Sequence, residues 1–168
     1  MAKYTPNLCV RVRPAEKSDA DLVISLYQQF ENYVRGLTPN VSIEEGLFDA
    51  ERYRADGFGE NPAFWGLVAE NGDEPVGYLL YHFGYDSQRA YRTMHLVELY
   101  VAEKHRGHGV GREFMKCAKA ICTKSNAKEI VWSVYKQNRA ARDFYEKLDA
   151  KLDDDADYMY IEVEKLNI

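Results

Sequence analysis

Three glycines alternate with other residues near the middle of the chain, at Gly107, Gly109 and Gly111, between Arg106 and Arg112. The segment before them is apolar and strand-like, and the segment after them is amphipathic and helix-like. Glycine lets the backbone approach a ligand closely, and the first N–H groups of a helix favour an anion. The pattern therefore predicts a phosphate-binding turn between a strand and a helix.

The spacing and the position of this turn limit which class of phosphate-containing ligand it could bind. Its G-x-G-x-G spacing differs from the G-x-G-x-x-G of dinucleotide-binding folds, and no Gly-Lys-Ser/Thr follows for a nucleoside triphosphate. The turn comes after the fourth predicted strand, whereas a dinucleotide fold places it after the first strand. A dinucleotide and a nucleoside triphosphate are both disfavoured.

The elements that position the turn follow one another with short connections. Alternating or buried apolar residues predict strands at 9–14, 63–70, 75–85, 94–101, 129–135 and 158–164. Helical periodicity predicts a first helix that Ser18 caps and that Gly36, Pro39 and Asn40 end. It also predicts further helices at about 43–54, 112–125 and 138–148. This order predicts one mixed α/β domain that spans residues 1–168.

Composition limits the classes of function. The 168 residues are 46% hydrophobic, which suits a globular domain, and the net charge of -5 disfavours a nucleic-acid partner. No apolar run has the length of a membrane span or the form of a signal peptide, so no membrane partner and a cytoplasmic location are expected. The three cysteines and four histidines lack metal-like spacing, and the side chains of His105 and His108 are expected to be exposed.

Two motifs together resemble those of the GNAT superfamily of N-acetyltransferases. Residues 106–111 (R-x-x-G-x-G) are similar to its acyl-CoA pyrophosphate loop, and residues 138–145 (N-x-x-A-x-x-F-Y) to its second motif. The chain is most similar to the diamine (spermidine/spermine) and thialysine acetyltransferases within it. This resemblance implies a central, mostly antiparallel twisted sheet with helices on both faces and a splayed strand pair that binds the cofactor.

The resemblance also implies an enzyme, an acyltransferase that moves an acetyl group from acetyl-CoA to a primary amine of a small molecule such as a polyamine or thialysine. The amine would attack the thioester directly and no metal would take part. Relatives are commonly homodimers, so a homodimer is implied by analogy. The implied cofactor-binding residues are Leu99, Tyr100, Val101, Arg106, Gly107, His108, Gly109, Val110, Gly111, Arg112, Asn138 and Ala141.

By the same resemblance, Tyr145 is the acid that protonates the leaving sulfur, since a phenol with its ordinary pKa of about 10 is protonated at neutral pH. Glu98 is the acid within the fourth predicted strand. It is expected either to take the proton of the attacking amine or to attract the cationic substrate. The implied substrate-binding residues are Tyr33, Asp86 and Glu98.

The chain departs from these relatives where the acceptor would bind. They carry paired acids on the fourth strand, where this chain has Val97-Glu98, and Tyr-Glu where it has Tyr33-Val34. The acids that remain for an acceptor pocket are Glu31, Glu44, Glu45 and Asp86. Asp149 stands where a glycine normally closes the last helix, in a left-handed conformation that aspartate tolerates.

Two other functions remain open at this point. A protein or peptide acetyltransferase would need an open groove beside the cofactor, which depends on residues 31–60. A non-catalytic regulatory module would still bind acyl-CoA at the glycine loop but would not catalyse acetyl transfer.

Overall fold

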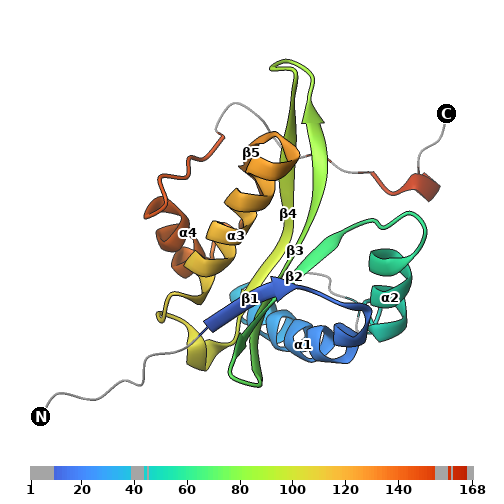
Figure 1. Cartoon of the computed structure of the whole chain (residues 1–168), viewed down its shortest axis with the longest axis vertical. Coiled ribbons are helices and arrows are strands. Elements are labelled where there is room, and N and C mark those ends of the chain that lie inside the picture. Colours follow the sequence, from blue (N-terminus) through green and yellow to red (C-terminus); the bar gives the residue numbers. More distant parts are fainter. Residues whose placement is uncertain (1–9, 39–43, 45, 154–158, 160, 166–168) are drawn as a thin grey trace, which may run out of the picture. The chain divides into compact units, whose positions relative to one another are not determined.

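The computed structural model describes residues 10–38, 44, 46–153, 159 and 161–165 (Figure 1). The chain divides into two compact units, residues 1–133 and 134–168. The single domain of 1–168 therefore stays a prediction. None of the helices in the described ranges is both long enough and apolar enough to cross a membrane.

A five-stranded sheet forms the centre of the first unit. Its strands are β1 (Val10–Pro14), β2 (Trp65–Asn71), β3 (Glu74–Asp86), β4 (Tyr91–Val101) and β5 (Ala127–Val131). They lie in the order β1-β2-β3-β4-β5; the first four are antiparallel, and β5 runs parallel to β4. The mostly antiparallel sheet that the resemblance implies is confirmed.

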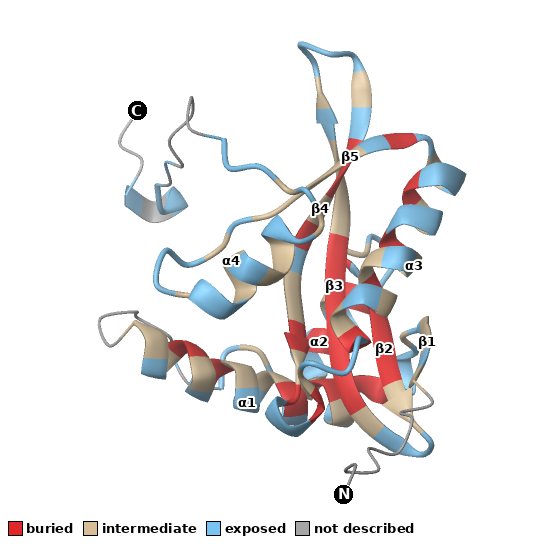
Figure 2. Ribbon diagram, turned by 90° about the vertical axis from the view of Figure 1, so that its left-hand side faces the viewer, coloured by how far each residue is buried: buried red, intermediate tan, exposed pale blue. Residues whose placement is uncertain are grey.

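Helices cover both faces of this sheet, as predicted. Helices α1 (Ala20–Leu37) and α2 (Ala50–Phe58) pack on one face, around Val23, Tyr53 and Tyr78. Helix α3 (Val110–Ser125) packs on the other face, where Phe114 meets Leu79. Buried residues run along β2 and β3 between the α1 and α3 layers (Figure 2). The two faces bury apolar side chains separately, so the central strands β2, β3 and β4 present both of their sides to a core.

The start of α1 differs from the prediction that Ser18 caps it. A 3₁₀ turn over Lys17–Asp19 comes first, and a capping box joins Glu16 to Asp19. The Glu16 N–H donates to Asp19 Oδ2 at 2.7 Å. The acid side chains reach two free N–H groups at once, which a serine hydroxyl at position 18 does not do here.

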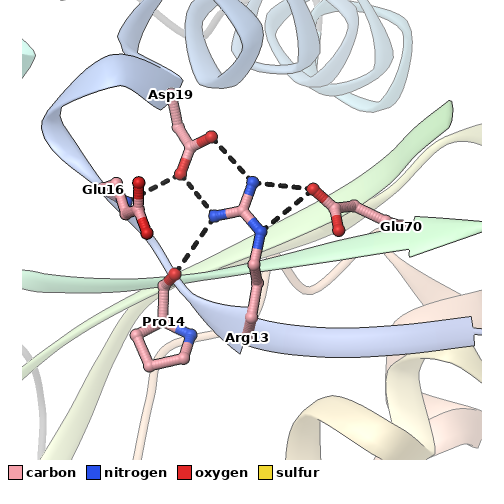
Figure 3. Close-up of polar contacts among 5 residues, drawn as sticks. All are labelled: Arg13, Pro14, Glu16, Asp19 and Glu70. Atoms are coloured by element: carbon pink, nitrogen blue, oxygen red, sulfur yellow. Dashed lines mark hydrogen bonds and ion pairs between the residues drawn. The ribbon is translucent and has the colours of Figure 1, made fainter. Parts of the chain in front are cut away.

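Arg13 ties this turn to the sheet (Figure 3). Its guanidinium donates to both carboxylate oxygens of Asp19, at 2.7 and 2.8 Å, and to Glu70 on β2 at 2.6 Å. The hydrogen bonds from Arg13 lower the pKa of the buried Asp19 carboxyl. Removing Arg13 would leave that carboxylate uncompensated, at a cost of about 3 kcal/mol.

Helix α2 begins and ends later than predicted. The Asp49 side chain accepts the Arg52 N–H at 2.7 Å, which fixes the first turn, and Gly59 is the C-terminal cap. The helix passes through Gly57, where a Cβ would lie only 2.7 Å from the Phe64 ring. Position 57 therefore has room only for a glycine because the Phe64 ring packs closely against it, and this glycine does not break the helix. Residues 43 and 45 of the predicted start lie outside the described residues, whereas residues 44 and 46–49 are described and are not helical.

The second unit contains α4 (Arg139–Glu146). Asp149 has a φ of +61°, so the left-handed conformation expected of it is confirmed. The strand predicted at 158–164 is wrong where the structure describes it. Val163–Lys165 forms a 3₁₀ turn. Ile161 and Val163 are exposed, so their alternation has no buried face to support a strand.

Candidate active site

The fourth strand carries a β-bulge at Val97. Leu80 of β3 is paired with Glu98, and the next residue, Tyr81, is paired with Leu96. Val97 is the extra residue on β4, and its side chain is exposed. A bulge of this kind shifts the alternation of side chains along the strand.

The shift decides which way Glu98 points. Met94 and Leu96 belong to the core beneath α3, and strict alternation would put Glu98 there too. After the bulge Leu99 faces α3 instead, whereas Tyr100 packs in the core beneath α1 and α2. Glu98, paired with Leu80 of that same core, lies on the α1 face.

This placement buries the carboxyl group of Glu98. Its Oε1 atom is buried and has no hydrogen-bond partner among the described residues. Burial raises the pKa of Glu98 to about 8, and the nearby charge of Glu31 on α1 adds to the shift. An acid with a pKa near the working pH is suited to accept a proton during a reaction.

Beyond Glu98 the sheet is open at one edge. The described pairing of β4 with β5 runs from Arg92 to His95 and ends there. Residues 96–101 continue along β4 and pair only with β3 within that part of the chain. A strand edge of this kind can pair with the amides of an extended ligand. The predicted splayed strand pair is therefore confirmed, and Leu99, Tyr100 and Val101 lie on its edge.

The glycine loop follows directly. A 3₁₀ turn, Glu103–His105, precedes it, and Gly109 forms the N-terminal cap of α3. Gly107 and Gly109 have φ values of +76° and +89°, which other residues rarely adopt. A Cβ at either glycine would meet no atom within 4 Å. The loop is thus open around both glycines and ends at a helix N-terminus, where backbone N–H groups and the helix dipole favour an anion.

The remaining loop residues have separate places. The first turn of α3 contains Val110, Gly111 and Arg112. His108 is exposed, and its Nδ1 atom lies 2.7 Å from the carbonyl oxygen of Arg106. His105 is buried and its Nε2 lies 3.4 Å from Glu74 Oε2, so the prediction that its side chain is exposed is wrong. The 3₁₀ turn brings that ring beside Glu74 at the start of β3, which the sequence does not reveal.

The second unit holds the other predicted motif. Asn138 caps α4, where its Oδ1 accepts the Ala141 N–H at 3.1 Å. The Tyr145 ring contacts the Phe144 ring at 5.1 Å between centroids. Burial raises the pKa of Tyr145 to about 12, so its hydroxyl is protonated at neutral pH and can donate.

Comparison with known proteins decides the family. Residues 25–150, most of the chain, match the acetyltransferase (GNAT) family. The chain belongs to this family. It is therefore an acyltransferase enzyme.

Curated relatives agree with this assignment. The acetyltransferase is 31% identical over 150 residues to thialysine N-epsilon-acetyltransferase from Bos taurus, a match that covers 84% of each chain. The protein of the same name from Sus scrofa is 32% identical over 150 residues, with the same coverage. Spermidine/spermine N(1)-acetyltransferase-like protein 1 from Homo sapiens is 28% identical over 149 residues, which cover 80% of this chain and 19% of that protein.

Solved structures share the fold of the acetyltransferase. An integron cassette protein from V. cholerae superposes with a TM-score of 0.75 and 22% identity, over 91% of this chain and 92% of that one. An aminoglycoside acetyltransferase from an uncultured soil metagenomic sample gives a TM-score of 0.71 and 18% identity, over 94% and 98%. At these identities the likeness concerns the fold.

The three predicted substrate residues of the acetyltransferase do not come together. Tyr33 on α1 lies under the Arg106 guanidinium, on the Glu98 side of the sheet. Asp86 ends β3, where it accepts the Arg89 N–H at 2.9 Å. Glu98 is paired with Leu80, so the rise from position 80 to position 86 separates the two acids by about 20 Å.

Sequence reasoning missed the bulge, although the sequence carries a signal for it. The apolar residues of β4 that face α3 are Met94, Leu96, Leu99 and Val101, so their spacing changes from two to three at the bulge. That change marks an inserted residue between Leu96 and Leu99. It also missed Tyr27, which lies one helical turn before Glu31 and whose pKa is raised by burial and by the charges of Glu31 and Glu98.

Proposed function

We propose that this acetyltransferase moves the acetyl group of acetyl-CoA to a primary amine of a small molecule, thialysine, a polyamine or a similar acceptor. The observation that carries the proposal is the position of Glu98, an acid turned by the bulge onto the α1 face, beside the open edge of β4. The names of the curated relatives support an acceptor with a lysine-like or polyamine nitrogen.

The residues present fit acetyl-CoA. Gly107 and Gly109 leave open space at the N-terminus of α3 for a pyrophosphate, and the edge at residues 99–101 offers backbone groups for the amides of the pantetheine arm. Arg112, Asn138 and Ala141 stay predicted cofactor residues. When bound, acetyl-CoA supplies the acyl group as a reactive thioester.

Two side chains handle the protons of the transfer. Glu98, once ionised, takes a proton from the acceptor nitrogen, because a free electron pair on that nitrogen is needed for attack. Tyr145 donates its proton to the leaving sulfur, since its raised pKa keeps it protonated through the neutral range. By analogy with relatives, we further propose that the chain is a single catalytic domain and that it forms a homodimer in the cytoplasm. Light scattering, which gives the mass in solution, tests the dimer.

The test measures thiol release from acetyl-CoA with thialysine, spermidine, lysine and a lysine-containing peptide. We expect turnover with a small amine and a loss of at least about 100-fold in kcat for Tyr145→Phe at unchanged acetyl-CoA affinity. Tyr85→Phe, at an exposed tyrosine of β3, is the matched control and keeps its activity. Turnover with the peptide alone would replace the small amine by a protein acceptor. Binding of acetyl-CoA without any turnover would indicate a regulatory module.

A further inference from the structure

Two acids, Glu31 and Glu98, each bury a carboxylate oxygen in one place between α1 and β4. Glu31 is 7% exposed in the middle of α1, and Glu98 faces that helix from the strand. The ring of Phe30 contacts Tyr100 at 6.0 Å between centroids, which shows that this turn of α1 packs on this part of β4. Glu31 and Glu98 are called the carboxylate pair below.

Both acids of the carboxylate pair are incompletely bonded. The Oε1 atom of Glu31 and the Oε1 atom of Glu98 are each buried, and neither has a hydrogen-bond partner among the described residues. Tyr27, one helical turn before Glu31, lies close enough to both acids for their charges to raise its pKa. Two buried oxygens are thus left without a donor, which is costly in a folded protein.

The charges around the pair do not relieve this cost. The nearby groups from α1 and from β4 with its following loop are Tyr27, Tyr33, Arg35, Tyr100 and Arg106. Arg106 is held elsewhere: its Nε donates to the Val101 carbonyl oxygen at 2.9 Å, and its guanidinium lies over the Tyr33 and Tyr100 rings. The Oε1 atoms of Glu31 and Glu98 accept no hydrogen bond from any of these groups.

A primary ammonium group supplies the positive charge and the hydrogen-bond donors that the carboxylate pair lacks. It brings one positive charge and three N–H donors, so it can satisfy both free carboxylate oxygens at once. The aromatic rings of Tyr27 and Phe30 on the same helix add faces that favour a cation. Buried like charges without a partner are expected at functional sites, where the ligand supplies the missing charge.

We propose that the carboxylate pair is the seat of the acceptor ammonium, with Glu31 as the second acid in place of the one that β4 lacks at Val97. This inference rests on the proposed function. Glu31 binds and orients the nitrogen, and Glu98 removes its first proton. The nitrogen then bonds to the acyl carbon, the carbon–sulfur bond breaks, and the sulfur takes its proton from Tyr145. The second proton that the nitrogen loses as the amide forms restores the Tyr145 hydroxyl.

Binding of the amine to the carboxylate pair should change the number of protons bound to the protein, and this change can be measured. With its raised pKa, Glu98 is mostly protonated at pH 7 while the site is empty. An ammonium beside it favours the ionised carboxylate, so binding of the amine releases a proton to solvent. Glu31→Gln removes the charge that adds to the pKa shift of Glu98, so the pKa of Glu98 is lower in this variant. A smaller fraction of Glu98 is then protonated before the amine binds, and fewer protons are released.

The experiment is calorimetric titration of thialysine or spermidine into the protein at pH 7, in buffers of different ionisation enthalpy. We expect the wild type to release close to one proton per amine, Glu31→Gln to release clearly less and to bind at least tenfold more weakly, and Glu98→Gln to release none. Glu51→Gln, which removes one exposed charge from α2, is the matched control and behaves as wild type.

Thermal unfolding separates a binding role of Glu31 from a structural one. Since glutamine has nearly the same shape and relieves the like-charge repulsion, Glu31→Gln should melt at or above the wild-type temperature and keep its acetyl-CoA affinity. A lower melting temperature with unchanged amine affinity would overturn the proposal. So would amine binding with equal proton release in Glu31→Gln and wild type, or no amine binding by the wild type.

The two proposals fail in different ways. If the wild type binds the amine with proton release but never acetylates it, the ammonium seat stands and the proposed function fails. If the wild type acetylates the amine and Glu31→Gln does so with an unchanged KM, the function stands and the ammonium seat fails.

Discussion

The guanidinium carbon of Arg106 lies 4.4 Å from the ring centroid of Tyr33, so the residue that opens the glycine loop is held against helix α1. Its Nε–H also donates to the Val101 carbonyl oxygen at 2.9 Å, at the end of β4. One side chain therefore links the loop, the open strand edge and the helix that carries Glu31.

Replacing Arg106 by lysine tests this link. Lysine keeps the charge but loses the planar group that stacks on Tyr33 and bonds to Val101, a loss of about 1.4 kcal/mol, so we expect about tenfold weaker acetyl-CoA binding. Equilibrium binding measures it. Arg52→Lys, at an exposed position of α2, is the control. Unchanged affinity in Arg106→Lys would show that the loop needs no support from α1.

The bulge at Val97 can be tested by removing it. Deletion of Val97 makes Leu96 and Glu98 direct neighbours, so strict alternation leaves Leu96 facing α3 and keeps Glu98 on the α1 face. Because both faces of the strand are kept, we expect a folded protein by urea unfolding that still releases thiol. Val97→Ala, which truncates an exposed side chain and keeps the bulge, should change stability by less than about 0.5 kcal/mol and keep the activity.

Glu98→Leu tests the orientation of this side chain. On the α1 face a leucine would join Leu80 and Tyr100 in the apolar core there, so we expect a protein at least as stable as wild type that has lost its activity. A Glu98→Leu variant that unfolds more easily than wild type and keeps its activity would contradict the orientation.

Gly109→Ala tests the loop conformation. The φ of +89° disfavours any Cβ, so we expect alanine to cost about 1–2 kcal/mol although nothing lies within 4 Å of it. Gly36→Ala is a matched control, since Gly36 lies inside α1 with equally open surroundings and should gain about 0.5–1 kcal/mol. Denaturant unfolding gives both values. Equal shifts in the two variants would contradict the strained conformation of Gly109.

The order of strands and helices could be predicted from the sequence because apolar periodicity reports which residues are buried. Every predicted strand up to β5 is present, and the helix after the glycine loop begins two residues earlier than predicted. The sequence could not show how the Arg13 network moves the start of α1 to Asp19, because Glu70 lies far along the chain.

The candidate site was predicted less completely. The loop glycines and Glu98 follow from local patterns, whereas the environment of Glu98 depends on the bulge and on Glu31, which belongs to a distant helix. Asp86 was grouped with Glu98 by residue type, and the length of β3 separates them. Residue type predicts which side chains can act, and the packing of α1 on the sheet decides which of them meet.

The pH dependence of kcat/KM for the amine acceptor tests the central claim that Glu98 is the base. Because Glu98 must be ionised to act and its pKa is raised to about 8, the wild-type value should rise with pH and level off above about 8. Glu98→Gln should lose this rise and fall at least about 100-fold at its upper limit, while Glu51→Gln keeps the wild-type profile. A Glu98→Gln variant with the wild-type rate and the same rise would contradict the claim.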